Sequence, residues 1–153
     1  MDFGGIYGDS VVEINGGTIY INGDIVGTYS NETYGNTLTI TGGNIQASDI
    51  TAAIAALSYE NTVNISGGTI NATDRLSGGR GWGTIRNNNL NISGGTIIGN
   101  IYAGDSGGDA SGRTVTDNCI NISGSPDISS AYLYGYSQND DHSGNALNII
   151  PKV

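Results

Sequence analysis

The sequence predicts an all-β fold: a parallel β-helix solenoid of about five coils, with roughly 26 residues per coil, forming a single domain over residues 1–153. Three observations support this prediction. A ten-residue motif recurs along the chain, its apolar residues alternate with polar ones, and an asparagine occupies the same position in five of the copies. A repeat period in this range is typical of architectures built by stacking repeats.

The clearest copies of the motif are Asn36-Thr-Leu-Thr-Ile-Thr-Gly-Gly-Asn-Ile45, Asn61-Thr-Val-Asn-Ile-Ser-Gly-Gly-Thr-Ile70 and Asn88-Asn-Leu-Asn-Ile-Ser-Gly-Gly-Thr-Ile97. A weaker copy starts at Ser10, a copy at Asn118 carries one extra residue, and a copy at Asn145 is shorter. The central isoleucines of the six copies are Ile14, Ile40, Ile65, Ile92, Ile122 and Ile149, so successive copies are 26, 25, 27, 30 and 27 residues apart.

Each copy begins with a short strand. Two apolar residues, as in Val63 and Ile65, lie two positions apart with a polar residue between them, which is the pattern of a strand with one buried face. A pair of glycines follows in four copies, as in Gly67 and Gly68, and predicts a tight turn with positive φ. A further inward residue such as Ile70 follows, and most copies then carry a third apolar segment.

A unit this thin cannot bury its inward face alone. Parallel stacking of equivalent strands, roughly 4.8 Å apart, places the isoleucines of successive coils in one continuous column. Right-handed winding is the expectation for parallel crossovers. Asparagine tolerates left-handed φ, and stacked asparagines can bond one another through their side chains. The sequence therefore predicts an internal asparagine ladder formed by Asn36, Asn61, Asn88, Asn118 and Asn145.

Two regions are less regular. Residues 48–57 also fit a helical spacing through Ile50, Ile54 and Leu57. Because Asp49-Ile50 aligns with Asp24-Ile25, we favour a β-coil there, and a helical turn is the alternative. The polar segments before the ladder asparagines vary in length and are expected to be loops at one corner of the solenoid, where binding functions tend to lie: residues 31–35, 78–86, 105–117 and 138–144.

The composition limits the partners. A net charge of −9 with only five Lys and Arg residues argues against nucleic acid and anionic membrane surfaces, both of which attract basic patches. No apolar run approaches the roughly 18 residues of a membrane-spanning helix, so no membrane insertion is expected. The single cysteine, Cys119, leaves no internal disulfide and no cysteine zinc site, and no cofactor is expected.

The chain begins late in one coil and stops early in another, with no polar cap apparent in the sequence at either end. Uncapped coil ends are unpaired strand edges. The sequence is therefore expected to be either an excerpt of a longer solenoid or a subunit that stacks head to tail on other copies.

The motif at residues 61–70, together with Gly-Asn-Ile-Tyr-Ala-Gly at 99–104 and Gly-Asp-Ala-Ser-Gly at 108–112, resembles the repeats of bacterial autotransporter-type and adhesin-like surface proteins. The resemblance covers nearly the whole chain. It implies a right-handed parallel β-helix that serves as a stalk or scaffold, and an extracellular, cell-surface location. That location is inferred from the resemblance alone, because no signal peptide is visible in the sequence.

Alternating tyrosines are the best candidate binding residues. They are expected to project outward as one aromatic strip, provided that Ile101 and Leu133 face the core. Such a strip suits sugar stacking or a protein interface, although aromatic pairs across neighbouring strands also stabilise a sheet. The strip consists of Tyr102, Tyr132, Tyr134 and Tyr136, with Tyr7 in the column of Tyr102 and Tyr134.

A regular array of small polar side chains is a further candidate surface. The outward positions of the first strand include Thr39, Asn64, Asn91 and Asn121. Their even spacing along the stack could match a repeating ligand such as a glycan.

Catalytic and metal sites are weaker candidates. Asp140, Asp141 and His142 are adjacent, but a glycosidase needs two carboxyl groups facing each other across one groove. The arginines are expected in or beside loops, so no catalytic residue is assigned and no enzyme is expected. Calcium prefers six to eight oxygen ligands, and the spacing of its weak candidate set matches no established loop. That set is Asp105, Asp109 and Asp117.

The sequence thus predicts a structural and adhesive extracellular module, a rigid stalk or fibre segment that contacts glycans or surface proteins of a host or neighbouring cell. Two alternatives remain open: a polysaccharide hydrolase or lyase, and a self-assembling fibre subunit.

Overall fold

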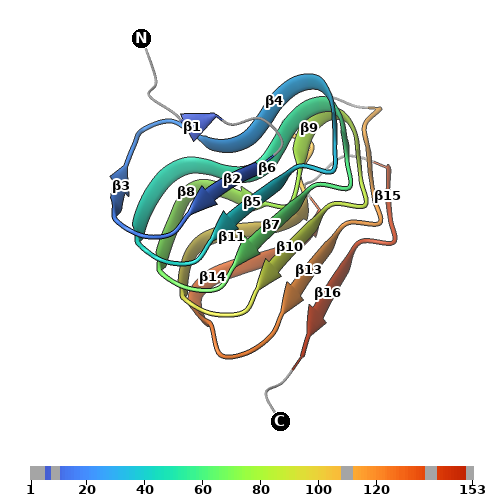
Figure 1. Ribbon diagram of the computed structural model, residues 1–153. Helices are drawn as coiled ribbons and strands as arrows, with labels where there is room; N and C mark the ends of the chain where they lie inside the picture. The colour runs from blue at the N-terminus through green and yellow to red at the C-terminus, as the bar shows by residue number, and fades with distance from the viewer. Residues whose placement is uncertain (1–5, 8–10, 108–111, 137–140, 151–153) are drawn as a thin grey trace.

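The computed structural model describes residues 6–7, 11–107, 112–136 and 141–150. These residues form sixteen strands and no helix, wound into about five stacked coils with the two ends of the chain at opposite ends of the stack (Figure 1). All strand pairs are parallel and fall into two sheets. The predicted parallel β-solenoid is confirmed.

The six-stranded sheet contains the first strand of each motif copy. Its neighbours pair without a register shift, so the six predicted anchor isoleucines form one column. The five anchors from Ile14 to Ile122 are buried, because every second side chain of these strands faces the interior. In stacking order the strands are β2 (Val11–Ile14), β5 (Thr37–Ile40), β7 (Thr62–Ile65), β10 (Asn89–Ile92), β13 (Cys119–Ile122) and β16 (Ala146–Ile149).

The ten-stranded sheet forms the rest of each coil. The second and third apolar segments predicted for most repeats merge here into single long strands in three of the coils, in β6, β11 and β14. The strands are β1 (Ile6–Tyr7), β3 (Thr18–Tyr20), β4 (Ile25–Tyr34), β6 (Asn44–Tyr59), β8 (Thr69–Ser77), β9 (Arg80–Arg86), β11 (Thr96–Gly104), β12 (Thr114–Thr116), β14 (Asp127–Tyr136) and β15 (Asp141–Ser143).

Strand β6 settles the ambiguous region. Residues 48–57 lie inside this 16-residue strand, so the β-coil is confirmed and the helical turn does not form. Its small residues accommodate very close neighbours. A Cβ built on Gly27 would lie 2.2 Å from the carbonyl oxygen of Ala52, and one on Gly81 would lie 1.9 Å from that of Ala55. The alanines and glycines therefore pack backbone against backbone, which an α-helix could not do here.

The loop prediction for the variable segments is wrong in part. Residues 31–34 belong to β4, residues 80–86 form β9, residues 114–116 form β12 and residues 141–143 form β15. An extended segment in a stack finds backbone partners in the neighbouring coils, whatever its polarity. The fully buried Ile85 and Val115 also give these segments an inward face. Arg80 and Arg86 consequently lie in a strand, whereas Arg113 directly precedes β12.

The predicted asparagine ladder is confirmed. The Oδ1 of Asn61 accepts a hydrogen bond from the Nδ2 of Asn36 at 2.8 Å and another from its backbone N–H at 3.0 Å. The same pair of bonds links each later ladder asparagine to the next, as far as Asn145. The residue before each ladder asparagine has a left-handed φ between 55° and 69°, at Gly35, Glu60, Asn87, Asp117 and Gly144.

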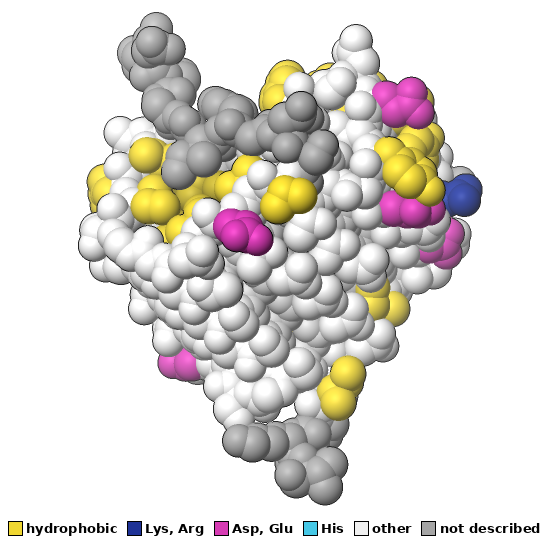
Figure 2. All heavy atoms as spheres, in the orientation of Figure 1, with side chains coloured by type: hydrophobic (Ala, Val, Ile, Leu, Met, Phe, Trp, Pro, Cys, Tyr) yellow, Lys and Arg dark blue, Asp and Glu magenta, His cyan; other side chains and the backbone are white. Residues whose placement is uncertain are grey.

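A second asparagine ladder runs outside the six-stranded sheet. Asn91 donates to the Oδ1 of Asn64 at 2.8 Å, Asn121 donates to Asn91 at 2.8 Å, and Asn148 donates to Asn121 at 2.9 Å. These residues include part of the predicted outward polar array, whose bonding to one another was not foreseen. The face shown in Figure 2 carries few charged side chains.

Candidate functional site

Two aspartates and two arginines gather on the outer side of the ten-stranded sheet. In β6 the neighbours Asp49, Ile50 and Thr51 are at most 3 % exposed, although successive side chains of a strand point to opposite faces. Ile50 lies in the core, so the outer side of β6 must also be covered. Residues further along the coils cover the outer side of β6 here. The outer surface of the ten-stranded sheet is therefore concave beside Asp49.

Two columns of residues face each other across this concavity. Asp49 pairs in register with Arg75 in one column, and Arg80 pairs with Asp105 in the other. Two ion pairs cross from column to column: the Nε of Arg75 lies 3.1 Å from the Oδ2 of Asp105, and Arg80 contacts the Oδ2 of Asp49 through Nη1. Within the second column, the Nε of Arg80 lies 3.2 Å from the Oδ2 of Asp105. We call Asp49, Arg75, Arg80 and Asp105 the charge cluster.

The charge cluster is deeply buried. The side chains of Asp49 and Asp105 are 5 % and 1 % exposed. Burial raises the pKa of Asp49 to about 6, and Asp24 and Asp74 add to this effect, while Arg80 and Arg75 oppose it. Burial alone would lower the pKa of Arg75, but the carboxylates of Asp105, Asp74 and Asp49 raise it overall. Both acids of the cluster thus face arginine guanidinium groups.

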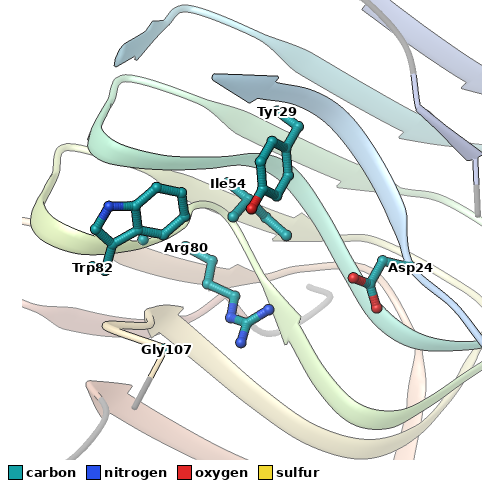
Figure 3. A pocket seen from close by; sticks show the side chains of 7 residues that line it. Asp24, Tyr29, Ile54, Arg80, Trp82 and Gly107 are labelled. Atoms are coloured by element: carbon teal, nitrogen blue, oxygen red, sulfur yellow. The ribbon is translucent and has the colours of Figure 1, made fainter. Parts of the chain in front are cut away.

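A cavity of about 240 Å³ lies beside the charge cluster, in the view of Figure 3. Its aromatic walls are Tyr29 on β4 and Trp82 on β9, whose ring centroids are 6.1 Å apart with their planes inclined at 44°. Asp24 lies on the opposite side, and the side chain of Arg80 extends between Trp82 and Asp24 (Figure 3). The full lining is Asp24, Tyr29, Ile54, Arg80, Gly81, Trp82 and Gly107.

The predicted tyrosines form an outward strip. Ile101 is buried and Leu133 packs against the core, as the prediction required. The rings of Tyr102 and Tyr134 stack at 4.9 Å with an interplanar angle of 16°, and Tyr132 is 69 % exposed. We call Tyr102, Tyr132, Tyr134 and Tyr136 the tyrosine strip.

The edges of the strip differ from the prediction. Tyr136 stacks on the ring of His142, with centroids 3.6 Å apart. Tyr7 does share the register column of Tyr102, but that column passes first through Val26, Thr51 and Ser77. Three coils therefore separate Tyr7 from Tyr102, and the strip is confined to β11 and β14.

The weaker candidates are not brought together. Asp105 faces two arginines, while Asp117 occupies the left-handed position before a ladder asparagine. Asp109 and Asp140 lie outside the described residues, as does the side chain of Asp141. Among the residues that the structure describes, no group of three His, Cys, Asp or Glu side chains is arranged to hold a metal ion.

Sequence reasoning missed the charge cluster and the cavity. One usable signal was the coil period, because Arg75 follows Asp49 by one coil and Asp105 follows Arg80 by one coil. The assignment of Arg75 and Arg80 to loops concealed it. Both arginines lie in strands, β8 and β9.

No family model, curated protein or solved structure matches the chain. The resemblance to bacterial surface proteins therefore stays an expectation based on the motif residues. The part of the chain that the structure describes contains no helix that is long and apolar enough to cross a membrane.

Proposed function

We propose that this chain is a rigid structural and adhesive module, extracellular in location, that displays the tyrosine strip to a glycan. The observation that carries the proposal is the exposure of aromatic rings on a stiff scaffold. Tyr132 and Tyr134 of β14 are 69 % and 42 % exposed, and both project from the same strand. An aromatic ring offers an apolar face and, in tyrosine, a polar hydroxyl, which suits contact with a sugar.

The scaffold supports a spacer role. The core runs through all coils as one cluster of isoleucine, leucine, valine and alanine side chains. The internal ladder and the outer ladder add hydrogen bonds between successive coils in the same direction. Successive coils are therefore fixed to one another at the core and by the internal ladder, and from Asn64 onward also by the outer ladder, so relative motion of the coils is opposed.

Binding to a panel of immobilised neutral and acidic oligosaccharides tests the adhesive part. Tyr132→Ala and Tyr134→Ala should each weaken binding by tenfold or more, because each removes an exposed ring from the strip. Tyr34→Ala is the matched control, since Tyr34 is 68 % exposed on β4 and lies outside the strip. Absence of binding to the whole panel, or equal weakening by Tyr34→Ala, would overturn the assignment.

A polysaccharide-cleaving activity is the second candidate. It is favoured by one observation: two buried carboxylates, Asp49 and Asp105, lie in the same concavity, and the pKa of Asp49 is raised to about 6. A raised pKa in a cleft is typical of a general acid. Release of reducing sugar from neutral or acidic glycans, lost in Asp49→Asn, would support this candidate, and no release from any substrate would count against it.

A further inference from the structure

We propose that the cavity between Tyr29 and Trp82 binds one neutral pyranose ring, either a free monosaccharide or the end of a glycan chain. This site lies apart from the tyrosine strip and does not depend on it. It extends the proposed function by naming a second binding position and the class of sugar that it takes.

The size of the cavity suits one ring. At about 240 Å³ it is smaller than the roughly 300–1,000 Å³ of sites for drug-sized ligands. Tyr29 and Trp82 come from different coils and remain 61 % and 44 % exposed, so their faces are open to a ligand. Their 44° inclination makes them two walls of an open corner, against which the C–H face of a pyranose can pack.

The polar groups of the lining suit hydroxyl groups. The carboxylate of Asp24 accepts hydrogen bonds, and the guanidinium of Arg80 donates them. Arg80 is held by Asp49 and Asp105, so its position is set before any ligand arrives, which lowers the entropic cost of binding.

The surrounding charge selects against anionic sugars. The carboxylates of Asp24, Asp49, Asp74 and Asp105 outnumber the guanidinium groups of Arg75 and Arg80 beside them. The excess negative charge repels a uronic acid. A neutral ring, which can donate to Asp24 and accept from Arg80, avoids this repulsion.

The only tryptophan of the chain lies in this cavity, so its fluorescence reports occupancy directly. The complete chain is titrated with glucose, galactose, mannose and N-acetylglucosamine, and with galacturonate as the anionic comparator. We expect a saturable change with at least one neutral sugar, and at least tenfold weaker binding of galacturonate. Saturation-transfer NMR on the same mixtures provides a readout that does not rely on Trp82.

Four variants assign the signal to the cavity. Tyr29→Ala and Asp24→Asn should weaken binding at least tenfold, and thermal melting checks that both remain folded. Tyr34→Ala and Tyr132→Ala should leave it unchanged. The proposal is overturned if neither readout saturates, if galacturonate binds as well as galactose, or if Tyr29→Ala has no effect. Loss of the signal in Tyr132→Ala would assign it to the tyrosine strip instead, so the two proposals can fail separately.

Discussion

Replacing Asn88 of the internal ladder by alanine should destabilise the stack by about 3–5 kcal/mol. The side chain is fully buried and makes four hydrogen bonds. Its Oδ1 accepts from the backbone N–H and the Nδ2 of Asn61, at 3.0 and 2.9 Å. Its Nδ2 donates to the Oδ1 of Asn118 and to the carbonyl oxygen of Ser58, at 2.9 and 3.0 Å.

The size of the effect follows from which partners are left without a bond. The Oδ1 of Asn118 still accepts from the backbone N–H of residue 88, and the Nδ2 of Asn61 still donates to the Oγ of Ser58. The backbone N–H of Asn61 loses its bond at a buried position, which costs about 1–3 kcal/mol. The carbonyl of Ser58 lies in the β6–β9 ladder, so its lost bond and the two others contribute less.

Asn91→Ala is the matched control. Asn91 lies in the same coil and also sits in a ladder, donating to Asn64 and accepting from Asn121 at 2.8 Å. It faces outward and is only partly buried, so water can replace the lost partners. The expected cost is about 0–1 kcal/mol.

Urea denaturation followed by far-UV circular dichroism measures the free energy of unfolding of both variants. Hydrogen exchange at the Asn61 amide gives a local readout, because coils of a solenoid can open separately. In Asn88→Ala this amide should exchange markedly faster. Equal costs for the two variants, or a cost below about 1 kcal/mol for Asn88→Ala, would refute the argument that burial makes the inner ladder strong.

Two further predictions concern the core and the charge cluster. Ile65→Asn should lower the free energy of unfolding by about 4–6 kcal/mol, because Ile65 is 1 % exposed and the amide would be buried without partners. An unchanged melting temperature would refute the placement of Ile65 in the core. Asn64→Ala, on the outer face of the same strand, is the control. The pKa of Asp49 is raised to about 6 from its ordinary value near 4, so the folded state binds the proton more tightly than the unfolded state. The stability that this group contributes is therefore fully present below about pH 4 and is lost as the pH rises through about 6, by at most about 1.4 kcal/mol per pH unit. Comparing urea denaturation of the wild type and Asp49→Asn between pH 4 and 7 isolates this contribution, and a wild type that gained stability relative to the variant over that range would contradict it.

The architecture was predictable from the sequence because it depends on local pattern and on period. Alternation of Val63 and Ile65 defines a strand with an inward face, and repetition at 25 to 30 residues places equivalent residues on top of one another. The ladder follows from the same logic, because Asn36, Asn61 and Asn88 must stack if the isoleucines do. These features need only the assumption that the inward face is buried by the next coil.

The strands within the variable segments were less predictable. Residues 80–86 are polar and rich in glycine, and such a composition is typical of a loop. They form β9 because β6 and β12 offer backbone partners on both sides. That pairing is a property of the stack and is absent from the segment taken alone.

The coil period indicates the two columns of the charge cluster, but the contacts between those columns and the cavity were decided by the tertiary structure. Arg80 lies 31 residues after Asp49, which is not one coil period, and the two residues occupy different columns. They meet only because the coil is concave between those columns, so that positions beyond the bend fold back over Asp49. Tyr29 and Trp82 come from β4 and β9, which β6 separates in the stack, and their contact spans that intervening strand. Repetition along the stack can be read from the chain, whereas contacts across a bend depend on the curvature of the coil, which the packing of the core determines.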